Sequence, residues 1–308
     1  MDDHLKRQSW FGLKQYVKQF LSLRVPNALL RGAARFVPSL RSGRWPAPAS
    51  LKEVEGRVGN ATFVMLDPAR CENAKELFWG QGRRPFAHDR LALDAVAVLA
   101  KEADVFLDIG AYTGLFTLAV AAIDQQIKAH AFEIVPGVAA ALEANVRRNG
   151  FEERVAVHRE GIGPAGATVR MPSGEGGSAL PSFYSTTLTF DEGEWIPLRS
   201  LDSLAELMPQ NASVVMKVDV EGTENVVFES GQAFLQTFRF DILCEVLPGR
   251  ADGEILDKLL APAALRRYLV TDSALIERDS IEPDQRYRDW LFTRRSADEL
   301  RRLGLVVR

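Results

Sequence analysis

Short apolar runs typical of β-strands alternate with helical patterns from residue 105 almost to the end of the chain, and this alternation restricts the fold more than any other feature. Repeated strand–helix–strand units build a doubly wound sheet with helices on both faces. The expected strands are 105–109, 128–134, 155–159, 214–218, 240–246, 267–271 and 289–293, and the expected helices are 115–122, 138–148, 201–208, 223–230 and 255–260. The sequence therefore predicts an α/β fold with a doubly wound, mostly parallel sheet and an antiparallel C-terminal edge.

The residues before this alternation are organised differently. Residues 1–50 place apolar side chains at helical spacing among Lys and Arg, which predicts a basic helical N-terminal extension. In residues 51–104, Gly59-Asn60 separates two strand-like runs and indicates a hairpin, and a helix leads from it into the sheet. The expected sheet domain is 105–308, interrupted at 164–196 by an insertion rich in Gly, Ser, Pro and aromatic residues.

Composition narrows the class of protein. With 46% hydrophobic and 26% charged residues over 308 positions, the chain can bury a full core. Cys71 and Cys244 lie too far apart in sequence to indicate a zinc site, and no signal-peptide pattern precedes them, so we expect a reduced, cytoplasmic protein. The longest apolar runs fall well short of the roughly 20 residues that span a bilayer, so no transmembrane helix is expected.

Charge is distributed unevenly along the chain. Residues 1–45 contain nine Lys or Arg and two Asp, a net charge of +7, so the overall charge of −3 leaves −10 for residues 46–308. The acidic body argues against nucleic acid as a partner. Three interpretations of the basic extension stay open: packing against the sheet domain or a second subunit of a homo-oligomer, contact with a membrane surface through Trp10, Phe11 and the lysines, or a solvated tail.

The first expected strand runs into a turn that contains two glycines, Gly110 and Gly114. Their G-x-x-x-G spacing differs from the G-x-G-x-x-G fingerprint that cradles the pyrophosphate of a dinucleotide. Asp108 at the end of the strand would repel a pyrophosphate, but it can bond, directly or through water, to the ammonium group of S-adenosylmethionine (SAM), which has no phosphate. The candidate SAM-binding residues of this turn are Asp108, Gly110, Ala111, Tyr112, Thr113 and Gly114.

A second carboxylate follows at a spacing that suits the same ligand. Glu133 ends the next expected strand, 25 positions after Asp108. An acidic side chain at about this spacing hydrogen-bonds ribose hydroxyls in this type of fold. Glu160 and Gly161, after the third strand, are weaker candidates for the adenine side. The alternative interpretations are a plain strand-to-helix turn for Gly110–Gly114 and a surface side chain for Glu160.

A cluster of charged residues follows the strand at 214–218. Strand alternation would put Lys217, Asp219 and Glu221 on one face, an arrangement that is costly unless the charges pair with one another, a substrate or a metal. Glu245, at the end of the following strand, could join the same pocket, because ligands bind at the carboxyl ends of parallel strands. The alternative is a structural ion-pair network in which Glu224 favours the N-terminus of the next helix.

These motifs together resemble the FkbM family of SAM-dependent methyltransferases. The resemblance rests on DIGAYTG (108–114), AFE (131–133), EANVRRNG (143–150), RSLDSL (199–204), KVDVEGTE (217–224), Gly231 and LCEV (243–246). It implies a Rossmann-like class I methyltransferase fold, SAM as the cofactor, and O-methylation of a hydroxyl on a sugar, glycan or natural product. Two positions depart from the family pattern: Tyr112 stands where Asn is common, and Ile134-Val135-Pro136 replaces a tighter Glu-Pro.

A hydroxyl is a poor nucleophile, so its methylation benefits from a base. Asp219 and Glu221 are the candidates for base or acceptor binding, with Lys217 orienting them and Glu245 completing the catalytic set. No metal is predicted; Mg²⁺ held by Asp219, Glu221 and Glu245 is the competing hypothesis. The aromatic insertion 172–195 is expected to cover a small-molecule or glycan acceptor, with loop packing as its alternative.

Two other functions remain as alternatives. A nicotinamide-dependent oxidoreductase would share the strand, the turn and the ribose-binding acid, but the chain lacks the third glycine of that fingerprint and an evident Tyr/Lys pair for hydride transfer. A non-catalytic protein with a SAM-type fold, binding a partner through its N-terminal arm, is the other alternative.

Overall fold

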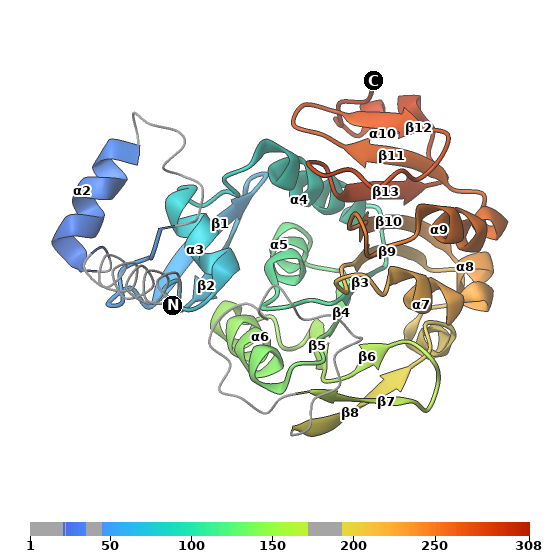
Figure 1. The fold of residues 1–308 in the computed structure, drawn as a ribbon, viewed down its shortest axis with the longest axis horizontal. Coiled ribbons are helices and arrows are strands. Elements are labelled where there is room, and N and C mark those ends of the chain that lie inside the picture. The colour runs from blue at the N-terminus through green and yellow to red at the C-terminus, as the bar shows by residue number, and fades with distance from the viewer. Residues whose placement is uncertain (1–20, 22, 35–44, 172–192) are drawn as a thin grey trace, which may run out of the picture.

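The structure is a computed structural model, and it describes residues 21, 23–34, 45–171 and 193–308 (Figure 1). The helices are α2 (Arg24–Ala34), α3 (Glu72–Trp79), α4 (Ala87–Ala100), α5 (Leu115–Ile123), α6 (Pro136–Asn149), α7 (Glu224–Glu229), α8 (Gln232–Thr237), α9 (Gly253–Leu260) and α10 (Ala297–Arg302), with 3₁₀ helices η2 (Asp202–Leu207) and η3 (Ala261–Ala263). The strands are β1 (Glu53–Val58), β2 (Ala61–Leu66), β3 (Val105–Ile109), β4 (Lys128–Phe132), β5 (Val155–His158), β6 (Gly161–Ile162), β7 (Thr168–Met171), β8 (Glu194–Arg199), β9 (Ser213–Val218), β10 (Arg239–Glu245), β11 (Arg266–Val270), β12 (Leu275–Arg278) and β13 (Asp289–Thr293).

The central sheet has eight strands in the order β12-β11-β13-β10-β9-β3-β4-β5. The five strands from β10 to β5 pair in parallel, whereas β13 is antiparallel to both β10 and β11, and β12 is antiparallel to β11. The predicted fold, a mostly parallel sheet with antiparallel C-terminal strands, is confirmed. Because β3 is the middle one of these five parallel strands, its carboxyl end lies between the carboxyl ends of β4 and β9.

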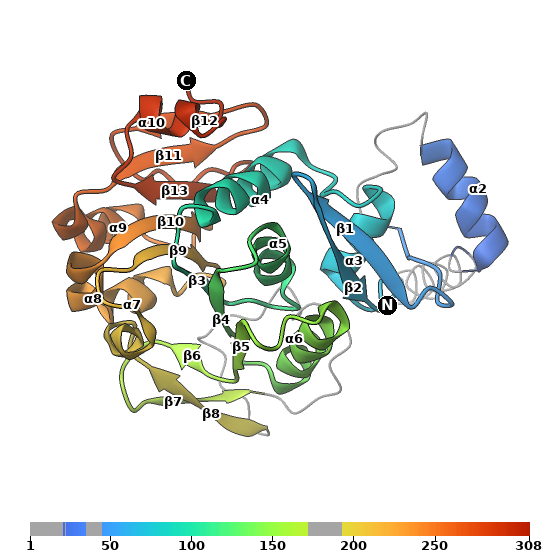
Figure 2. The same cartoon turned by 180° about the vertical axis from the view of Figure 1, so that it is seen from behind.

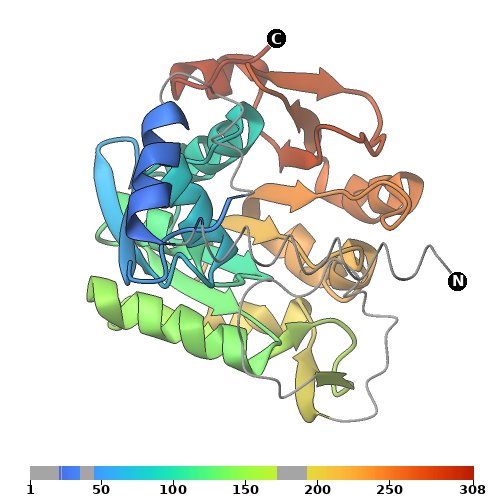
Figure 3. The same cartoon turned by 60° about the vertical axis from the view of Figure 1, so that its left-hand side comes forward.

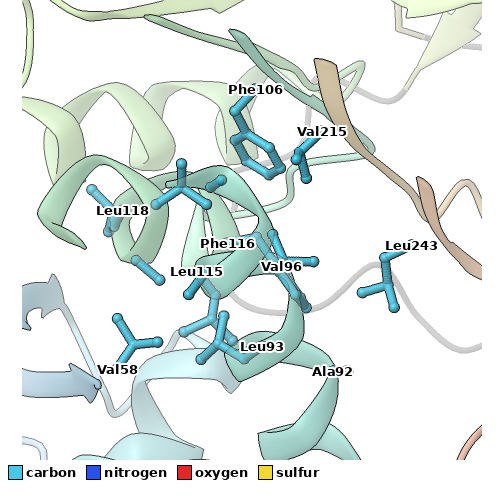
Figure 4. Close-up of a cluster of buried hydrophobic side chains, with 14 of the residues drawn as sticks. Val58, Ala92, Leu93, Val96, Phe106, Leu115, Phe116, Leu118, Val215 and Leu243 are labelled. Atoms are coloured by element: carbon cyan, nitrogen blue, oxygen red, sulfur yellow. The ribbon is translucent and has the colours of Figure 1, made fainter. Parts of the chain in front are cut away.

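Helices cover both faces of this sheet, as Figure 3 shows. All five residues of β3 are buried, as expected for a central parallel strand with helices on both sides. Phe106 and Val215 point into one core with α4 and α5, and Leu93, Val96, Leu115 and Leu118 fill the space between them (Figure 4). The opposite core packs α7, α8 and α9 against side chains such as Leu107 and Met216.

The N-terminal hairpin packs onto the sheet domain. β1 and β2 pair antiparallel and turn at Gly59-Asn60, as the sequence indicated. Val58, Phe63 and Met65 are buried in the same core as α4 and α5, so the hairpin shares the main core (Figures 1 and 2). This packing brings β2 close to α5 and α6, the two helices that flank the glycine turn.

The basic extension is described only in part. In α2, Leu30 packs against a small cluster formed by Ala47, Phe78 and Trp79, while Val25 and Leu29 are exposed. Trp10 and Phe11, the proposed membrane contacts, lie outside the described residues. Over the part of the chain that the structure describes, no helix is long and apolar enough to cross a membrane.

The insertion forms part of a second, three-stranded sheet of order β6-β8-β7. β7 and β8 pair antiparallel, and Trp195 on β8 is 65% exposed, with Arg170 over its ring. Residues 172–192, which contain the other aromatic side chains of the insertion, lie outside the described residues. The expectation that this segment covers an acceptor stays a prediction.

Candidate functional site

The glycine turn between β3 and α5 lies directly against the segment that leaves β9. Gly110 has φ +78°, in the left-handed region that favours glycine. A Cβ atom on Gly110 would lie 1.8 Å from the carbonyl oxygen of Asp219, so no side chain fits at this position. The two motifs that the sequence singled out are therefore in backbone contact, which places Asp219 beside the turn.

Tyr112 occupies a left-handed position in the same turn, with φ +52°. Asn adopts this conformation more readily than most residues, which explains physically why Asn suits the position. The link between Tyr112 and β4 comes from the backbone, because the N–H of Tyr112 donates to Glu133 Oε2 over 2.9 Å. The substitution of Tyr for Asn therefore leaves this link intact.

Glu133 is buried at the end of β4 with both carboxylate oxygens facing backbone amides. Oε2 accepts from Tyr112, and Oε1 accepts from the N–H of Val135 over 2.8 Å. Burial raises the pKa of Glu133 to about 7, against the lowering effect of these two hydrogen bonds. Each oxygen of a carboxylate can accept a second hydrogen bond, so Glu133 can also receive a pair of ribose hydroxyls.

Asp108 is 1% exposed and turns toward the first turn of α5. Its Oδ2 accepts from the N–H and the hydroxyl of Thr117, at 3.1 and 2.6 Å, whereas its Oδ1 has no hydrogen-bond partner among the described residues. Burial raises the pKa of Asp108, and the positive charge of Lys217 opposes this rise. An unpaired carboxylate oxygen beside the turn fits a ligand that brings an ammonium group, so Asp108, Glu133 and the turn together fit SAM.

Ala111 and Thr113, the remaining predicted residues of the turn, are each 5% exposed. The N–H of Ala111 donates to the carbonyl of Phe132, which joins the turn to β4. Gly114, with φ +90°, precedes α5, and a Cβ there would lie 2.3 Å from Leu142 on α6. The structure thus brings all the predicted residues of the turn together at the carboxyl edge of the sheet.

Lys217, which is buried, and Asp219, which is partly exposed, form an ion pair at the end of β9. Lys217 Nζ donates to Asp219 Oδ2 over 2.8 Å and lies 5.1 Å from the centre of the Phe116 ring. Burial lowers the pKa of Lys217, but the charges of Asp219 and Asp108 outweigh burial and raise it overall. Burial works against ionisation of Asp219, and Lys217 outweighs it, so the pKa of Asp219 is lowered. At neutral pH this pair is charged.

Glu245 hydrogen-bonds to Asp219 from the end of β10. Burial and the negative charges of Asp219 and Asp289 raise the pKa of Glu245 to about 10. Glu245 is therefore a neutral acid at pH 7 and donates to the Asp219 carboxylate. The three side chains form one unit, in which Asp219 receives hydrogen bonds from Lys217 on one side and Glu245 on the other.

Comparison with known proteins assigns the chain to a family. A sequence model described as the methyltransferase FkbM domain matches residues 108–269, more than half of the chain. The chain belongs to the FkbM methyltransferase family. The family uses SAM, and the match includes the glycine turn, Glu133 and the Lys217–Asp219–Glu245 unit of this methyltransferase. A search of curated proteins found no match.

Several solved structures resemble the FkbM-family chain in fold. A SAM-dependent methyltransferase from Agrobacterium tumefaciens is 10% identical, with 81% of this chain and 72% of that chain covered and a TM-score of 0.44. An O-methyltransferase family protein from Burkholderia thailandensis is 10% identical, with coverages of 68% and 59% and a TM-score of 0.38. The mitomycin 7-O-methyltransferase MmcR is 14% identical, with a TM-score of 0.33; 71% of this chain is covered, and the match spans 56% of the length of that protein.

Glu221 lies beyond the end of β9, so the strand alternation from which it was grouped with Lys217 and Asp219 does not apply to it. β9 ends at Val218, and Glu221 follows in a left-handed turn with φ +57°, where its exposed carboxylate pairs with Arg250 over 3.1 Å. The turn nevertheless folds back, so that oxygens of Asp219, Glu221 and Glu245 lie within 4.8 Å of one another. Three oxygen ligands at this separation could hold a divalent cation.

The structure also shows the contacts of three other residues that the sequence singled out. Glu224 is buried, and its Oε1 accepts from the N–H groups of Gly222 and Val220 at 3.0 and 3.3 Å, so it stabilises the turn that precedes α7. Glu160 lies 3.8 Å from Arg199 at the carboxyl edge. Gly161 is covered by Leu198 and Ile134, which a Cβ would meet at 2.4 and 2.8 Å. Cofactor contacts of Glu160 and Gly161 stay predictions.

Two residues of this FkbM methyltransferase site were missed by sequence reasoning. Asp289 begins β13 opposite Glu245, and burial together with Asp89 and Asp219 raises the pKa of Asp289 to about 6. Arg84 forms ion pairs with Glu76 and Asp89 at 2.8 and 3.1 Å, and its charge also acts on Asp219 and Asp289. Both lie outside the family match, and only their tertiary position reveals them.

Proposed function

We propose that this FkbM-family methyltransferase is an O-methyltransferase that acts on a hydroxyl of a sugar, glycan or natural product. The observation that carries the proposal is the Lys217–Asp219–Glu245 unit in backbone contact with the cofactor turn at Gly110. A hydroxyl needs a proton acceptor to become a nucleophile, whereas many nitrogen nucleophiles do not. A carboxylate beside the turn supplies that acceptor.

In the proposed reaction, each residue of the site has a role of its own. Asp108, Glu133 and the backbone of the turn hold SAM, which supplies a methyl group on positively charged sulfur. Asp219 accepts the hydroxyl proton, and Lys217 holds the Asp219 carboxylate in place. Glu245, neutral because its pKa is about 10, donates to Asp219 and so orients it in a single geometry. Glu221 and the aromatic insertion 172–195 are assigned to acceptor binding.

The test measures methyl transfer with a panel of acceptors. The full chain is incubated with SAM and with sugars, glycolipids and secondary metabolites, and products are identified by mass and by the atom that carries the new methyl group. The proposal expects a methyl ether, and it expects Asp219→Asn to lose at least about 100-fold in turnover while still binding S-adenosylhomocysteine. Full turnover by Asp219→Asn would remove Asp219 from the proposed mechanism.

A metal-assisted mechanism is the second candidate, because the Asp219, Glu221 and Glu245 oxygens lie within 4.8 Å of one another. A divalent cation at this position would bind the acceptor oxygen and lower the pKa of its hydroxyl. EDTA treatment separates the two mechanisms: unchanged turnover excludes the cation, and lost turnover that Mg²⁺ restores establishes it.

The cofactor itself is tested independently of the acceptor. Thermal shift and calorimetry with SAM, S-adenosylhomocysteine and NAD should show binding of the first two ligands alone. Binding of NAD would favour the oxidoreductase alternative. Binding of none of the three would favour the non-catalytic alternative.

A further inference from the structure

The end of α6 contains a motif whose role the proposed function leaves unexplained, EANVRRNG at 143–150. Asn145 in this motif is 2% exposed, and both the nitrogen and the oxygen of its side-chain amide form hydrogen bonds. Nδ2 donates to the carbonyl of Thr113 in the cofactor turn over 2.8 Å, and Oδ1 accepts from the N–H of Leu66 on β2 over 2.8 Å. One side chain therefore joins the turn to the N-terminal hairpin.

A second contact from the N-terminal segment reaches the same residue of the turn. Cys71 Sγ lies 3.1 Å from the hydroxyl of Thr113, and both side chains are buried. Cys71 also caps α3, where its sulfur accepts from the N–H of Ala74. Thr113 is thus held through its carbonyl by α6 and through its hydroxyl by the start of α3.

These contacts hold the residue of the turn that follows the one bonded to Glu133. Tyr112 donates to Glu133 on β4, and the neighbouring Thr113 is held by Asn145 and Cys71. This part of the turn is therefore held by Glu133 after β4 at one residue and by α6 and the start of α3 at the next. Because Tyr112 has a left-handed backbone, the turn depends on such external contacts to keep its shape.

We propose that Asn145 is a positioning residue for SAM, and that the segment 53–79 is an integral part of the cofactor site. Through Asn145 the placement of β2 sets the placement of the Thr113 carbonyl, and with it the N–H groups of the turn. This inference rests on the proposed cofactor site at Gly110–Gly114. It extends that site to residues that precede the family match at 108–269.

The chain offers a matched control on the same helix. Asn149 lies one turn after Asn145 and also bonds β2, because its Oδ1 accepts from the N–H of Val64 over 2.7 Å and its Nδ2 donates to the Val64 carbonyl over 2.8 Å. It has no hydrogen bond to the cofactor turn in the described structure. Asn149→Ala therefore weakens the hairpin attachment and leaves the contact with Thr113 in place.

The test compares S-adenosylhomocysteine binding, measured by calorimetry on the full chain, in wild type, Asn145→Asp and Asn149→Ala. Asn145→Asp keeps the acceptor for Leu66 and replaces the donor to Thr113 by a carboxylate oxygen. The dissociation constant of Asn145→Asp is expected to rise by about tenfold or more, and that of Asn149→Ala by less than about threefold. Equal affinities in all three proteins, or equal losses in both variants, would overturn the proposal.

Hydrogen exchange on the wild type keeps the inference testable even if Asn145→Asp does not fold. S-adenosylhomocysteine should slow amide exchange in β2, including Leu66, as well as in the turn. Protection confined to the turn and β4 would overturn the proposal. If the wild type binds neither SAM nor S-adenosylhomocysteine, the proposed function fails, which is a different result from binding that is insensitive to Asn145.

Discussion

Gly110→Ala tests the contact that joins the two motifs of the site. The substitution has two separate costs. The first is the left-handed backbone at φ +78°, which costs a residue with a side chain about 1 kcal/mol. The second is steric, because the new Cβ would lie 1.8 Å from the Asp219 carbonyl oxygen, well inside the 3.0 Å that real Cβ atoms respect.

The steric cost can be worked from this geometry. The Asp219 carbonyl has to retreat by at least the difference between 1.8 and 3.0 Å, although the N–H of Asp219 is bonded to the Ile109 carbonyl. Overpacking of a rigid site costs about 1–3 kcal/mol, so we expect Gly110→Ala to lose about 2–4 kcal/mol of unfolding free energy in total. Moving Asp219 also moves the proposed proton acceptor, so turnover should fall even where SAM still binds.

Gly150→Ala is the matched control, since Gly150 has φ +69° but a Cβ added there would meet no atom within 4 Å. It should lose only the backbone cost of about 1 kcal/mol and keep its affinity for S-adenosylhomocysteine. The assay combines chemical denaturation, which gives the free energy of unfolding, with calorimetry for affinity. If Gly110→Ala is no less stable than Gly150→Ala and binds the ligand equally well, the backbone contact between the two motifs does not exist as described.

Three further predictions concern single side chains. Glu245 has a pKa of about 10 in the folded protein and of 4.5 when unfolded, so the unfolding free energy should fall as pH rises between these values, by at most about 1.4 kcal/mol per pH unit. Glu245→Gln should flatten this decline, and an unchanged slope would contradict the assignment. Because the pKa of Glu133 is about 7, affinity for S-adenosylhomocysteine should rise as pH increases through 7. In calorimetry, Glu133→Gln should bind this ligand weakly, with an affinity that does not change with pH. If the affinity of the variant depends on pH as that of the wild type does, Glu133 is not the titrating group. Tyr112→Asn should bind S-adenosylhomocysteine within about threefold of wild type, because the link to Glu133 comes from the backbone; a loss above about tenfold would place the ring itself in the site.

Much of the fold could be predicted from the sequence. Fully buried parallel strands appear in a sequence as continuous apolar runs, and the segments between them have apolar residues at helical spacing. β3, β9 and β10 lie close to the predicted ranges for this reason, and β4 also lies close to its range although it is only partly buried. β12 and α8 were not predicted, since Leu275–Arg278 and Gln232–Thr237 are short and have weak periodicity. The predicted helix at 201–208 forms as a 3₁₀ helix, η2.

The site was predictable to the extent that its residues follow strand ends in sequence. Asp108, Glu133, Asp219 and Glu245 converge because parallel strands end at one edge, which the alternation alone implies. Glu221 lies near Asp219 and Glu245, but strand alternation was the wrong reason to expect this, because β9 ends at Val218.

Arg84, Asp289 and the Asn145 bridge could not be predicted from local patterns. Asp289 reaches the site because β13 pairs antiparallel with β10, and the strand register cannot be read from either segment alone. Arg84 arrives through the packing of the segment between α3 and α4. The role of Asn145 depends on the docking of β2 against α6, two segments 79 residues apart in sequence.

The central claim, a SAM site formed by the glycine turn and Glu133, is tested most directly by a crystal structure of the full chain with S-adenosylhomocysteine. The account predicts ribose hydroxyls within hydrogen-bond distance of the Glu133 carboxylate and the amino group of the ligand beside Asp108, linked to Oδ1 directly or through water. A ligand bound elsewhere, or one whose ribose avoids Glu133, would contradict it.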